Sequence, residues 1–539
     1  VVLEDLTIRN GLAPRGGGLL VHGGATLRRV RVENNVAESA LDAEGGGIYC
    51  DHVELVLEDT TVIGNRASLT DTTTTEVRVL GGGGVYHQGD RLRIIGGSIE
   101  ENRVTGGASG NGGGLVMDQS HHEWDALTDL TVDGTSIRGN TIELTGSDTR
   151  GTGGGIYFRG VEGPSSRKMT LANVRLEGNR IVANGGMGGG LLCSVQNGFG
   201  GSPTIEIVGT TVAMNRLELG TGYGTGGGIA VFEEYMDGDY ELQVTVDRSR
   251  VTGNAIVGGN SISGGGLWLD HGPTFDTSRV ESTLSITRSE IADNELQGSM
   301  SNGAGIYYQC HICDSHLVLA QSTVSGNRSI GSQGAKSGGV GTGDIINVSV
   351  IDSTISNNEA RAASGPARGG GIGVHSHEIS SLHVASSTIT ANLVTGPDAA
   401  GGGIYFDAWS DESNEFEDRL TATVANTIVA QNTGGDCAAE FEWVFYEARS
   451  TGYNLFGAMG TCNVIAGTGD QLGANAQLLP LADNGGATKT HALGASSPAL
   501  DRGDPVGCKA FDGTVLAVDQ RDLPRVANGR CDVGSVEAQ

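Results

Sequence analysis

One pattern of apolar and polar positions repeats along most of the chain. Each repeat has an asparagine preceded by aliphatic residues at minus three and minus eight and an apolar residue at minus ten, as Asn179 is by Leu176, Leu171 and Met169. Positions minus ten and minus eight point to one face of a strand, and minus three lies on a second strand. The pattern returns every 30 to 40 residues, which favours a stacked repeat over separate domains. The asparagines are Asn35, Asn65, Asn102, Asn140, Asn179, Asn215, Asn254, Asn294, Asn327, Asn358, Asn392 and Asn432.

A third strand precedes these two in each repeat. It follows a glycine run and alternates, so that Ile156 and Phe158 after glycines 153–155 point inward while Tyr157 points outward. Helical periodicity is absent, and the use of Gly, Thr, Ser and Val disfavours helix. We therefore predict an all-β fold, a single-stranded parallel β-helix of about 12–13 coils with three short strands per coil.

The repeated asparagine has a mechanical role in such a coil. Inward-facing asparagines on successive coils can hydrogen-bond amide to amide in a ladder, and asparagine also tolerates left-handed backbone at a bend. We predict the ladder. The alternative is a series of surface turn asparagines that do not contact one another.

The repeats assign residues 1–433 to the β-helix and residues 434–539 to a C-terminal cap over the last coil. We expect His491, Asp501 and the 519–521 run to hold this cap by hydrogen bonds and an Arg–carboxylate pair rather than to act in catalysis. Deletion of 434–539 is then expected to give aggregated protein. Because Val1 already lies within a coil, we also expect an N-terminal cap upstream, and an uncapped first coil could stack on another molecule.

The acidic composition argues against nucleic acid as a partner and suggests Ca²⁺ as a candidate ligand. The 539 residues include 63 acidic and 34 basic side chains, for a net charge of −29, which argues against nucleic-acid binding. No apolar stretch approaches the ~20 residues of a transmembrane helix. The acidic loop with Glu233, Glu234, Asp237 and Asp239 could hold Ca²⁺, and the alternative is a solvated acidic surface. No other cofactor is expected.

The eight cysteines fall into two kinds. Cys437 with Cys462, Cys508 with Cys531, and Cys310 with Cys313 are predicted to form disulfides, which would place the protein outside the cytoplasm. Cys50 and Cys193 take the same inward position four coils apart, about 19 Å at the strand spacing. This is beyond the ~7 Å limit for bridged Cα atoms, so we predict two free, buried thiols.

The outward position two residues after the glycine run carries no acidic cluster. Polysaccharide lyases and hydrolases need paired carboxylates or metal-binding carboxylates, so the pattern does not favour an enzyme. Aromatic residues recur there instead, and aromatic faces stack on sugars or anchor proteins. The alternative is cross-strand stacking that stabilises the sheet, or cover of the row by loops. The predicted outward aromatic stripe comprises Tyr49, Tyr86, Tyr157, Trp268, Tyr307 and Tyr405.

The tail carries an ordered set of motifs. They are GYNLFG at 452–457, PLADNGGATKTHAL at 480–493, SPALDRGD at 497–504, DQRDLPR at 519–525 and CDVGSVE at 531–537. This set resembles the C-terminal region of bacterial choice-of-anchor Q proteins. The glycine-rich repeats resemble, more loosely, the β-helix repeats of polymorphic outer-membrane and autotransporter proteins. The resemblance implies a right-handed β-helix that is secreted and displayed on a bacterial surface, and it implies no catalytic residues.

The leading hypothesis from the sequence is therefore a non-enzymatic extracellular or cell-surface protein for display, adhesion or assembly. Its partner would be a surface glycan or a protein. The first alternative is a polysaccharide lyase or hydrolase. The second is a structural subunit that self-associates through its open N-terminal coil.

Overall fold

The structure is a computed structural model that describes all of the chain except residues 52–53, 71–79, 120–127, 161–166, 198–201, 237–239, 272–279, 311–313, 345, 377–379, 410–418 and 443. The chain forms two compact units. Unit 1 comprises Val1–Val244, Ser249–Arg279 and Gln297–Ser299, and unit 2 comprises Thr245–Arg248, Val280–Leu296 and Met300–Gln539. The domain boundary predicted at residues 433 and 434 lies inside unit 2.

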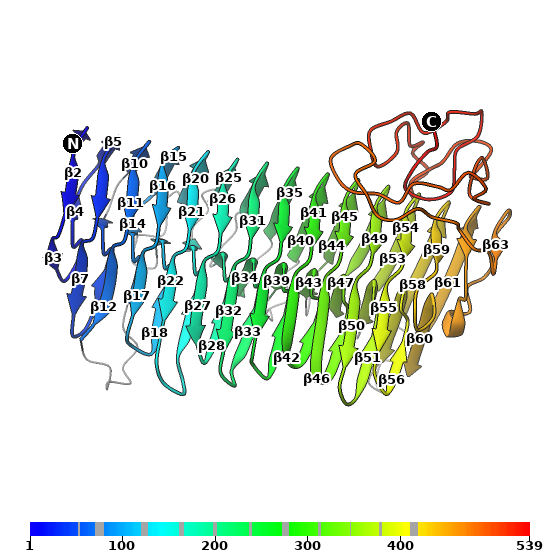
Figure 1. The fold of residues 1–539 in the computed structure, drawn as a ribbon, viewed down its shortest axis with the longest axis horizontal. Helices are drawn as coiled ribbons and strands as arrows, with labels where there is room; N and C mark the ends of the chain where they lie inside the picture. Colours follow the sequence, from blue (N-terminus) through cyan, green and yellow to red (C-terminus); the bar gives the residue numbers. More distant parts are fainter. Residues whose placement is uncertain are drawn as a thin grey trace. The chain divides into compact units, whose positions relative to one another are not determined.

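One coil of unit 1 shows how the repeat folds. It runs through β9 (Ile48–Asp51), β10 (Glu54–Glu58), β11 (Thr61–Ile63), β12 (Arg66–Leu69) and β13 (Leu80–Gly81). Each strand pairs in parallel, in register, with its counterpart one coil on. We call the resulting sheets A (with β10), B (β11), C (β12 and β13) and D (β9). The predicted parallel β-helix is confirmed (Figure 1).

Sheet C was not predicted from the sequence. Its strands follow the asparagine and are as short as β17 (Arg103–Thr105) and β18 (Ser109–Asn111), each with one buried residue between two less buried ones. Three residues are too few to display an alternation in the sequence. A coil therefore has strands in four sheets rather than the three that were predicted.

Sheet D and the second strands of sheet C position the candidate site of unit 1. Sheet D contains β4 (Leu19–His22), β9, β14 (Val85–Gln88), β19 (Leu115–Asp118), β24 (Ile156–Gly160), β29 (Leu191–Asn197), β34 (Ile229–Met236) and β39 (Leu267–His271). The second strands of sheet C are β8 (Ala43–Glu44), β13, β18, β23 (Arg150–Thr152), β28 (Gly185–Met187), β33 (Tyr223–Thr225) and β38 (Ser261–Ser263).

Unit 2 repeats the same four sheets. Its sheet D contains β43 (Ile306–Cys310), β47 (Val340–Asp344), β52 (Ile372–Ser376), β57 (Ile404–Trp409) and β60 (Cys437–Glu442). Its sheet B contains β41 (Glu290–Ala292), β45 (Thr323–Ser325), β49 (Thr354–Ser356), β54 (Thr388–Thr390), β59 (Ile428–Ala430), β62 (Leu455–Phe456) and β63 (Gln471–Leu472). Strand pairing thus continues to Leu472, past the predicted boundary.

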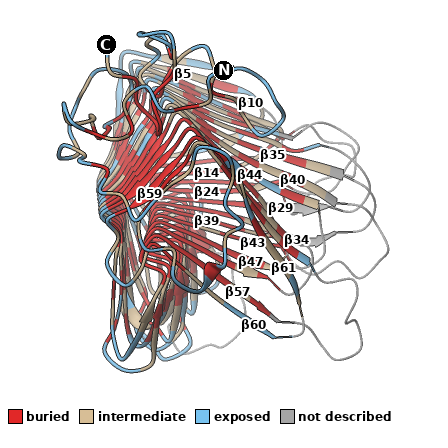
Figure 2. Cartoon of the chain, turned by 90° about the vertical axis from the view of Figure 1, so that its right-hand side faces the viewer, coloured by how far each residue is buried: buried red, intermediate tan, exposed pale blue. Residues whose placement is uncertain are grey.

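The inward residues form the core, and the asparagines form the predicted ladder. Leu27, Val32 and their counterparts on later coils are fully buried along the inner faces of the sheets (Figure 2). In unit 1 each Nδ2, from Asn35 to Asn215, donates to Oδ1 of the next asparagine at 2.9–3.0 Å. In unit 2 the same bonds link Asn294 to Asn432 at 2.9 Å and end on Oδ1 of Asp436. The alternative of separate surface asparagines is wrong.

The cysteines follow the prediction where the structure describes them. Cys437 and Cys462 form one disulfide and Cys508 and Cys531 another, while Cys50 and Cys193 are free and buried. Cys310 is also disulfide-bonded, and its predicted partner Cys313 lies outside the described residues. Such disulfides are typical of proteins that fold outside the reducing cytosol. Within the described part of the chain, no helix is long and apolar enough to cross a membrane.

Residues 473–539, here the C-terminal module, do not simply close the last coil. They lie along the outer face of sheet B in unit 2 (Figure 1). Gln520 Nε2 donates to Thr323 Oγ1 at 2.9 Å, and the His491 Nε2 to Ser356 Oγ distance is 2.7 Å. The predicted end cap is therefore mainly a lateral cover, because its hydrogen bonds reach back several coils.

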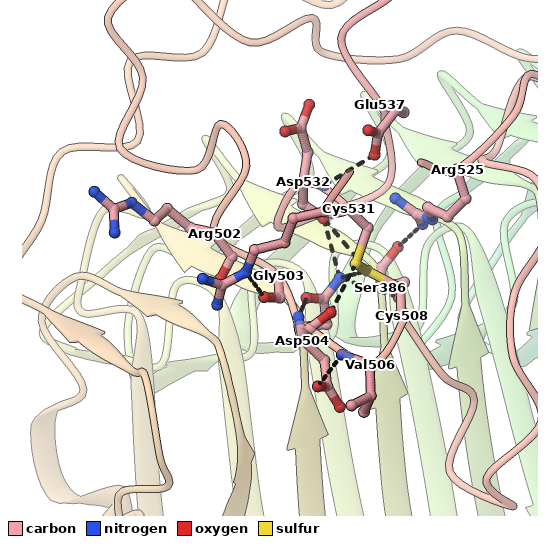
Figure 3. Close-up of a disulfide and its surroundings, with 12 residues drawn as sticks. Ser386, Arg502, Gly503, Asp504, Val506, Cys508, Arg525, Cys531, Asp532 and Glu537 are labelled. Atoms are coloured by element: carbon pink, nitrogen blue, oxygen red, sulfur yellow. Dashed lines mark hydrogen bonds between the residues drawn. A yellow bond between two sulfur atoms is a disulfide. The ribbon is translucent and has the colours of Figure 1, made fainter. Parts of the chain in front are cut away.

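Buried polar contacts hold this module in place, and several of them involve residues that were not among those predicted from the sequence. The Arg525 side chain is fully buried, forms an ion pair with Asp352, and donates to the carbonyl of Ser386 at 3.1 Å. Near the Cys508–Cys531 disulfide, the Glu537 carboxylate accepts the backbone N–H of Asp532 at 2.8 Å (Figure 3). Burial raises the pKa of Glu537 to about 7.

Candidate functional site

The predicted aromatic stripe lies on the outward side of sheet D but is mostly covered. Tyr49, Tyr86, Tyr157, Trp268 and Tyr405 are all less than 10% exposed, and Tyr307 is half-buried. The prediction of an open stripe is wrong, because neighbouring side chains cover the rings, as Arg368 on β51 (Pro366–Arg368) of sheet C covers Tyr405 in unit 2. In unit 1, for example, the Arg15 guanidinium sits 5.6 Å from the centre of the Tyr49 ring, which stacks on Tyr86.

One member of the stripe, Trp268, lines an open pocket in unit 1. The pocket has a volume of about 480 Å³ and lies between sheet D and the second strands of sheet C. Its lining residues are Asp148, Thr149, Arg150, Asn184, Gly185, Gly186, Met187, Gly222, Tyr223, Thr225, Phe232 and Trp268. A volume in the hundreds of Å³ is typical of small-molecule sites.

Aromatic side chains form one side of this pocket. Trp268 on β39 and Phe232 on β34 stack with their ring centres 5.9 Å apart and their planes 22° apart. In register with Trp268 on β34 stands Ala230, and such a small side chain leaves space beside the indole. Tyr223 on β33 is 75% exposed and faces the same space from sheet C. The pocket therefore has a largely buried aromatic ring, Trp268, on one side and an exposed ring, Tyr223, on the other.

Polar groups line the rest of the pocket. Arg150 and Asp148 supply charge of both signs, and the Asn184 Oδ1 accepts the backbone N–H of Thr221 at 2.9 Å. The Thr225 Oγ1 is buried and has no hydrogen-bond partner among the described residues. A buried hydroxyl of this kind favours a ligand or water that supplies the missing partner. The pocket can thus combine ring stacking with directed hydrogen bonds.

Most of this pocket was not predicted from the sequence. The predicted stripe comprises only the row two residues after the glycine run, which supplies Trp268, whereas Phe232 lies four residues after the run. Tyr223, Arg150 and Met187 lie on sheet C, which was not predicted. The aromatic Tyr223 just before the glycine run was the one residue in the sequence that could have indicated the sheet C side of the pocket.

A carboxyl group that protonates near neutral pH lies elsewhere on this surface of unit 1. Glu44 on β8 is 3% exposed, and burial raises its pKa to about 7 even though the Arg15 Nε lies 2.6 Å from its carboxylate. Burial also raises the pKa of Tyr49 to about 12. Glu44 was not predicted as a site residue, because it precedes the glycine run whereas the predicted row follows it.

The calcium candidates do not form a described site. Glu233 is fully buried and forms a close ion pair with His271, which is equally buried. Five residues after the glycine run is an inward position, so Glu233 points into the coil rather than into a surface loop. The side chain of Glu234 and residues Asp237 and Asp239 lie outside what the structure describes. Among the described residues no cluster of three His, Cys, Asp or Glu side chains could hold a metal ion.

Comparisons of the chain with protein-family models, with curated proteins and with solved structures found no match.

Proposed function

We propose that this protein is an extracellular β-helix protein that binds carbohydrate through the Trp268 pocket and serves in surface display or adhesion. The observation that carries the proposal is the stacked Trp268–Phe232 pair beside the exposed Tyr223. Sugar rings present flat C–H faces to aromatic rings and hydroxyl groups to polar side chains. The pocket supplies partners for both.

Three further observations support this assignment. Arg150, Asp148 and Thr225 place donors and acceptors around the rings, as sugar hydroxyls require. The disulfides favour an oxidising compartment. The resemblance of the tail to choice-of-anchor Q proteins favours display on a bacterial surface.

A glycan array followed by calorimetry tests the proposal. Tyr223→Ala is the informative variant, because the side chain is 75% exposed and its loss leaves the core intact. We expect affinity for the glycan that binds the wild type to fall about tenfold, in line with the loss of one aromatic contact. Met214→Ala is the matched control, since Met214 is an exposed apolar residue of unit 1 that does not line the pocket.

Two outcomes would remove the proposal. Wild-type protein that binds no glycan on the array would leave the pocket without a ligand of this class. Equal affinity in wild type and Tyr223→Ala would place glycan binding elsewhere on the molecule.

A further inference from the structure

The outward aromatic row of sheet D is interrupted in unit 2. Tyr307 and Tyr405 occupy the row on β43 and β57, but the two strands between them carry Gly341 and Gly373. A Cβ on Gly341 would lie 2.9 Å from Ser337 Oγ and 3.1 Å from the Tyr307 ring. The two glycines thus leave a notch in the row, and the side chain of Ser337 enters it.

Ser337 itself departs from the repeat. It stands where neighbouring coils have the first glycine of the run, and it keeps the left-handed backbone of those glycines, with φ of +52° against +63° for Gly303 and +66° for Gly369. A non-glycine residue is strained in this region, and such strain occurs at functional sites. Ser337 is fully buried, and its Oγ has no hydrogen-bond partner among the described residues.

A histidine and an aspartate lie beside this serine. The His375 Nδ1 to Asp407 Oδ2 distance is 3.3 Å, across the paired strands β52 and β57. The other ring nitrogen points toward the notch, because a Cβ on Gly373 would lie 3.1 Å from His375 Nε2 and 2.2 Å from Ser337 Oγ. Both atoms therefore converge on the space above Gly373.

Two further groups shape the cluster. The Lys336 Nζ lies 3.2 Å from Asp407 Oδ2. Burial opposes ionisation of Asp407, yet the hydrogen bond and charge of His375 and the charge of Lys336 hold the pKa of this carboxyl well below its usual range. The His375 ring also sits 6.0 Å from that of Tyr405, whose hydroxyl accepts a hydrogen bond from Arg368 Nε at 3.1 Å. Asp407 is therefore an anion fixed against the histidine.

We propose that Ser337, His375 and Asp407 form a nucleophile, base and orienting acid that hydrolyse short-chain acyl esters, such as acetyl groups on sugar hydroxyls. A serine on a strained turn, a histidine whose ring converges on it, and a carboxylate on the far ring nitrogen are the parts that this chemistry requires. The confined notch between Tyr307 and His375 favours a small acyl group. The activity is separate from glycan binding at the Trp268 pocket.

The reaction balances with water as the only co-reactant. Ser337 Oγ attacks the acyl carbonyl carbon as His375 Nε2 takes the hydroxyl proton, and the tetrahedral oxyanion can be stabilised by the Lys336 ammonium. The bond to the sugar oxygen then breaks, and that oxygen takes the proton from His375. Water, deprotonated by His375, attacks the acyl-serine and releases the carboxylic acid and free Ser337. Access requires the half-buried Tyr307 ring, which borders Ser337, to turn aside.

A covalent probe and a chromogenic ester test the assignment. We expect a fluorophosphonate to modify the wild-type protein on Ser337, located by peptide mass spectrometry, and p-nitrophenyl acetate to be hydrolysed. Ser337→Ala and His375→Ala should each lower the hydrolysis rate at least 100-fold, and Asp407→Asn should lower it at least tenfold.

Ser337→Gly keeps the test independent of folding. Glycine is the residue of the neighbouring repeats and is unstrained at this φ, so the variant should melt at or above the wild-type temperature while losing both labelling and hydrolysis. A purely structural serine gives a different result: no adduct on Ser337 and equal hydrolysis in wild type, Ser337→Ala and Ser337→Gly. That outcome would overturn the proposal.

Discussion

The inward residues of sheet B are apolar in both units, but its outward residues differ between the units in charge and in burial. In unit 1 the outer residues are mostly charged or polar and partly exposed, as in β6 (Arg31–Glu33), β21 (Ser136–Arg138) and β26 (Arg175–Glu177). In unit 2 every residue of β41, β45, β49, β54 and β59 is buried. The outer residues there are mainly Thr, Ser, Ala and Ile, and Glu290 is the one charged residue among these five strands.

The difference shows that one coil pattern can support two kinds of surface. In unit 1 the outer residues pair with each other in water, as Arg138 does with Glu100 at 3.0 Å. In unit 2 short hydroxyl side chains allow the C-terminal module to approach and hydrogen-bond, as Thr354 Oγ1 does to Gln520 Oε1 at 2.6 Å. Long charged side chains would block that approach. The outer face is therefore matched to its cover.

The largest expected effect is that of removing the cover. Deletion of residues 473–539 would expose the outer face of sheet B in unit 2, including Ile428 and Leu455, which pack in an apolar cluster with Ala499 and Val533 of the deleted module. We expect the truncated protein to aggregate, since an exposed apolar and uncharged sheet face associates readily. Size-exclusion chromatography with light scattering measures this.

A charged face should rescue the truncation. Thr354→Arg with Ser356→Glu, and Thr388→Arg with Thr390→Glu, copy the Arg31 and Glu33 arrangement of unit 1. If the truncated protein stays aggregated with these four changes, the outer face is not the cause. A monomeric truncation without them would show that the cover is dispensable.

The next effect concerns ion pairs on the two faces. Arg525→Ala leaves the buried Asp352 without its partner, so we expect the free energy of unfolding of unit 2 to fall by about 3–5 kcal/mol. Arg138→Ala breaks the exposed pair with Glu100 and should leave the free energy of unfolding almost unchanged. Urea titration followed by circular dichroism compares the two variants. Equal midpoints would mean that the module contributes little to stability.

Substitutions of inward-facing ladder asparagines should lower the stability of both units equally. Asn179→Ala and Asn358→Ala each remove the acceptor of two buried donors on the preceding asparagine, its backbone N–H and its Nδ2. We expect each to cost about 2–4 kcal/mol, since each leaves buried donors unsatisfied. The exposed Asn260 serves as control, and Asn260→Ala should stay within about 0.5 kcal/mol of wild type. Unequal losses at 179 and 358 would show that the outer cover alters the ladder.

The smallest expected effect is a pH dependence of the free energy of unfolding, caused in each unit by one buried carboxyl group. The pKa of Glu537 and that of Glu44 are each raised by burial from 4.5 to about 7, so the folded state binds the proton more tightly than the unfolded state. The stability from this proton is complete below pH 4.5 and is lost as the pH rises through 7. We expect a loss of roughly 1–2 kcal/mol for each group over this pH range.

Glutamine variants separate the two contributions. Glu537→Gln should flatten the pH dependence of unfolding in unit 2, and Glu44→Gln should flatten it in unit 1. The measurement is the urea midpoint at pH 4.5, 6 and 7.5. A dependence that survives both variants would have to come from other groups.

The sequence predicted the inside of the coil well. The apolar positions relative to each asparagine, the ladder and the inward place of the two free thiols follow from local spacing, because an inward position is defined by the two-residue period of a strand. The two described disulfides were predicted by pairing neighbouring cysteines of the tail. A second ladder was not predicted: in unit 2 the backbone N–H of Ser289 donates to Ser322 Oγ, Ser322 to Ser353, and Ser353 to Ser387, at 3.1–3.2 Å.

The sequence alone thus determined what points into each coil, since that face is set by neighbours within a few residues. Only the tertiary structure decided which outward residues meet water. Tyr86, a member of the predicted outward stripe, is 1% exposed and stacks on Tyr49, whereas Tyr223, which was not predicted to lie at a site, is 75% exposed. Gln520 reaches Thr323 across 197 residues, a contact that no local period records. The exposure of an outward side chain depends on segments that are distant in the sequence. The two proposed sites, the Trp268 pocket and the notch beside Ser337, lie where the neighbouring side chains leave space.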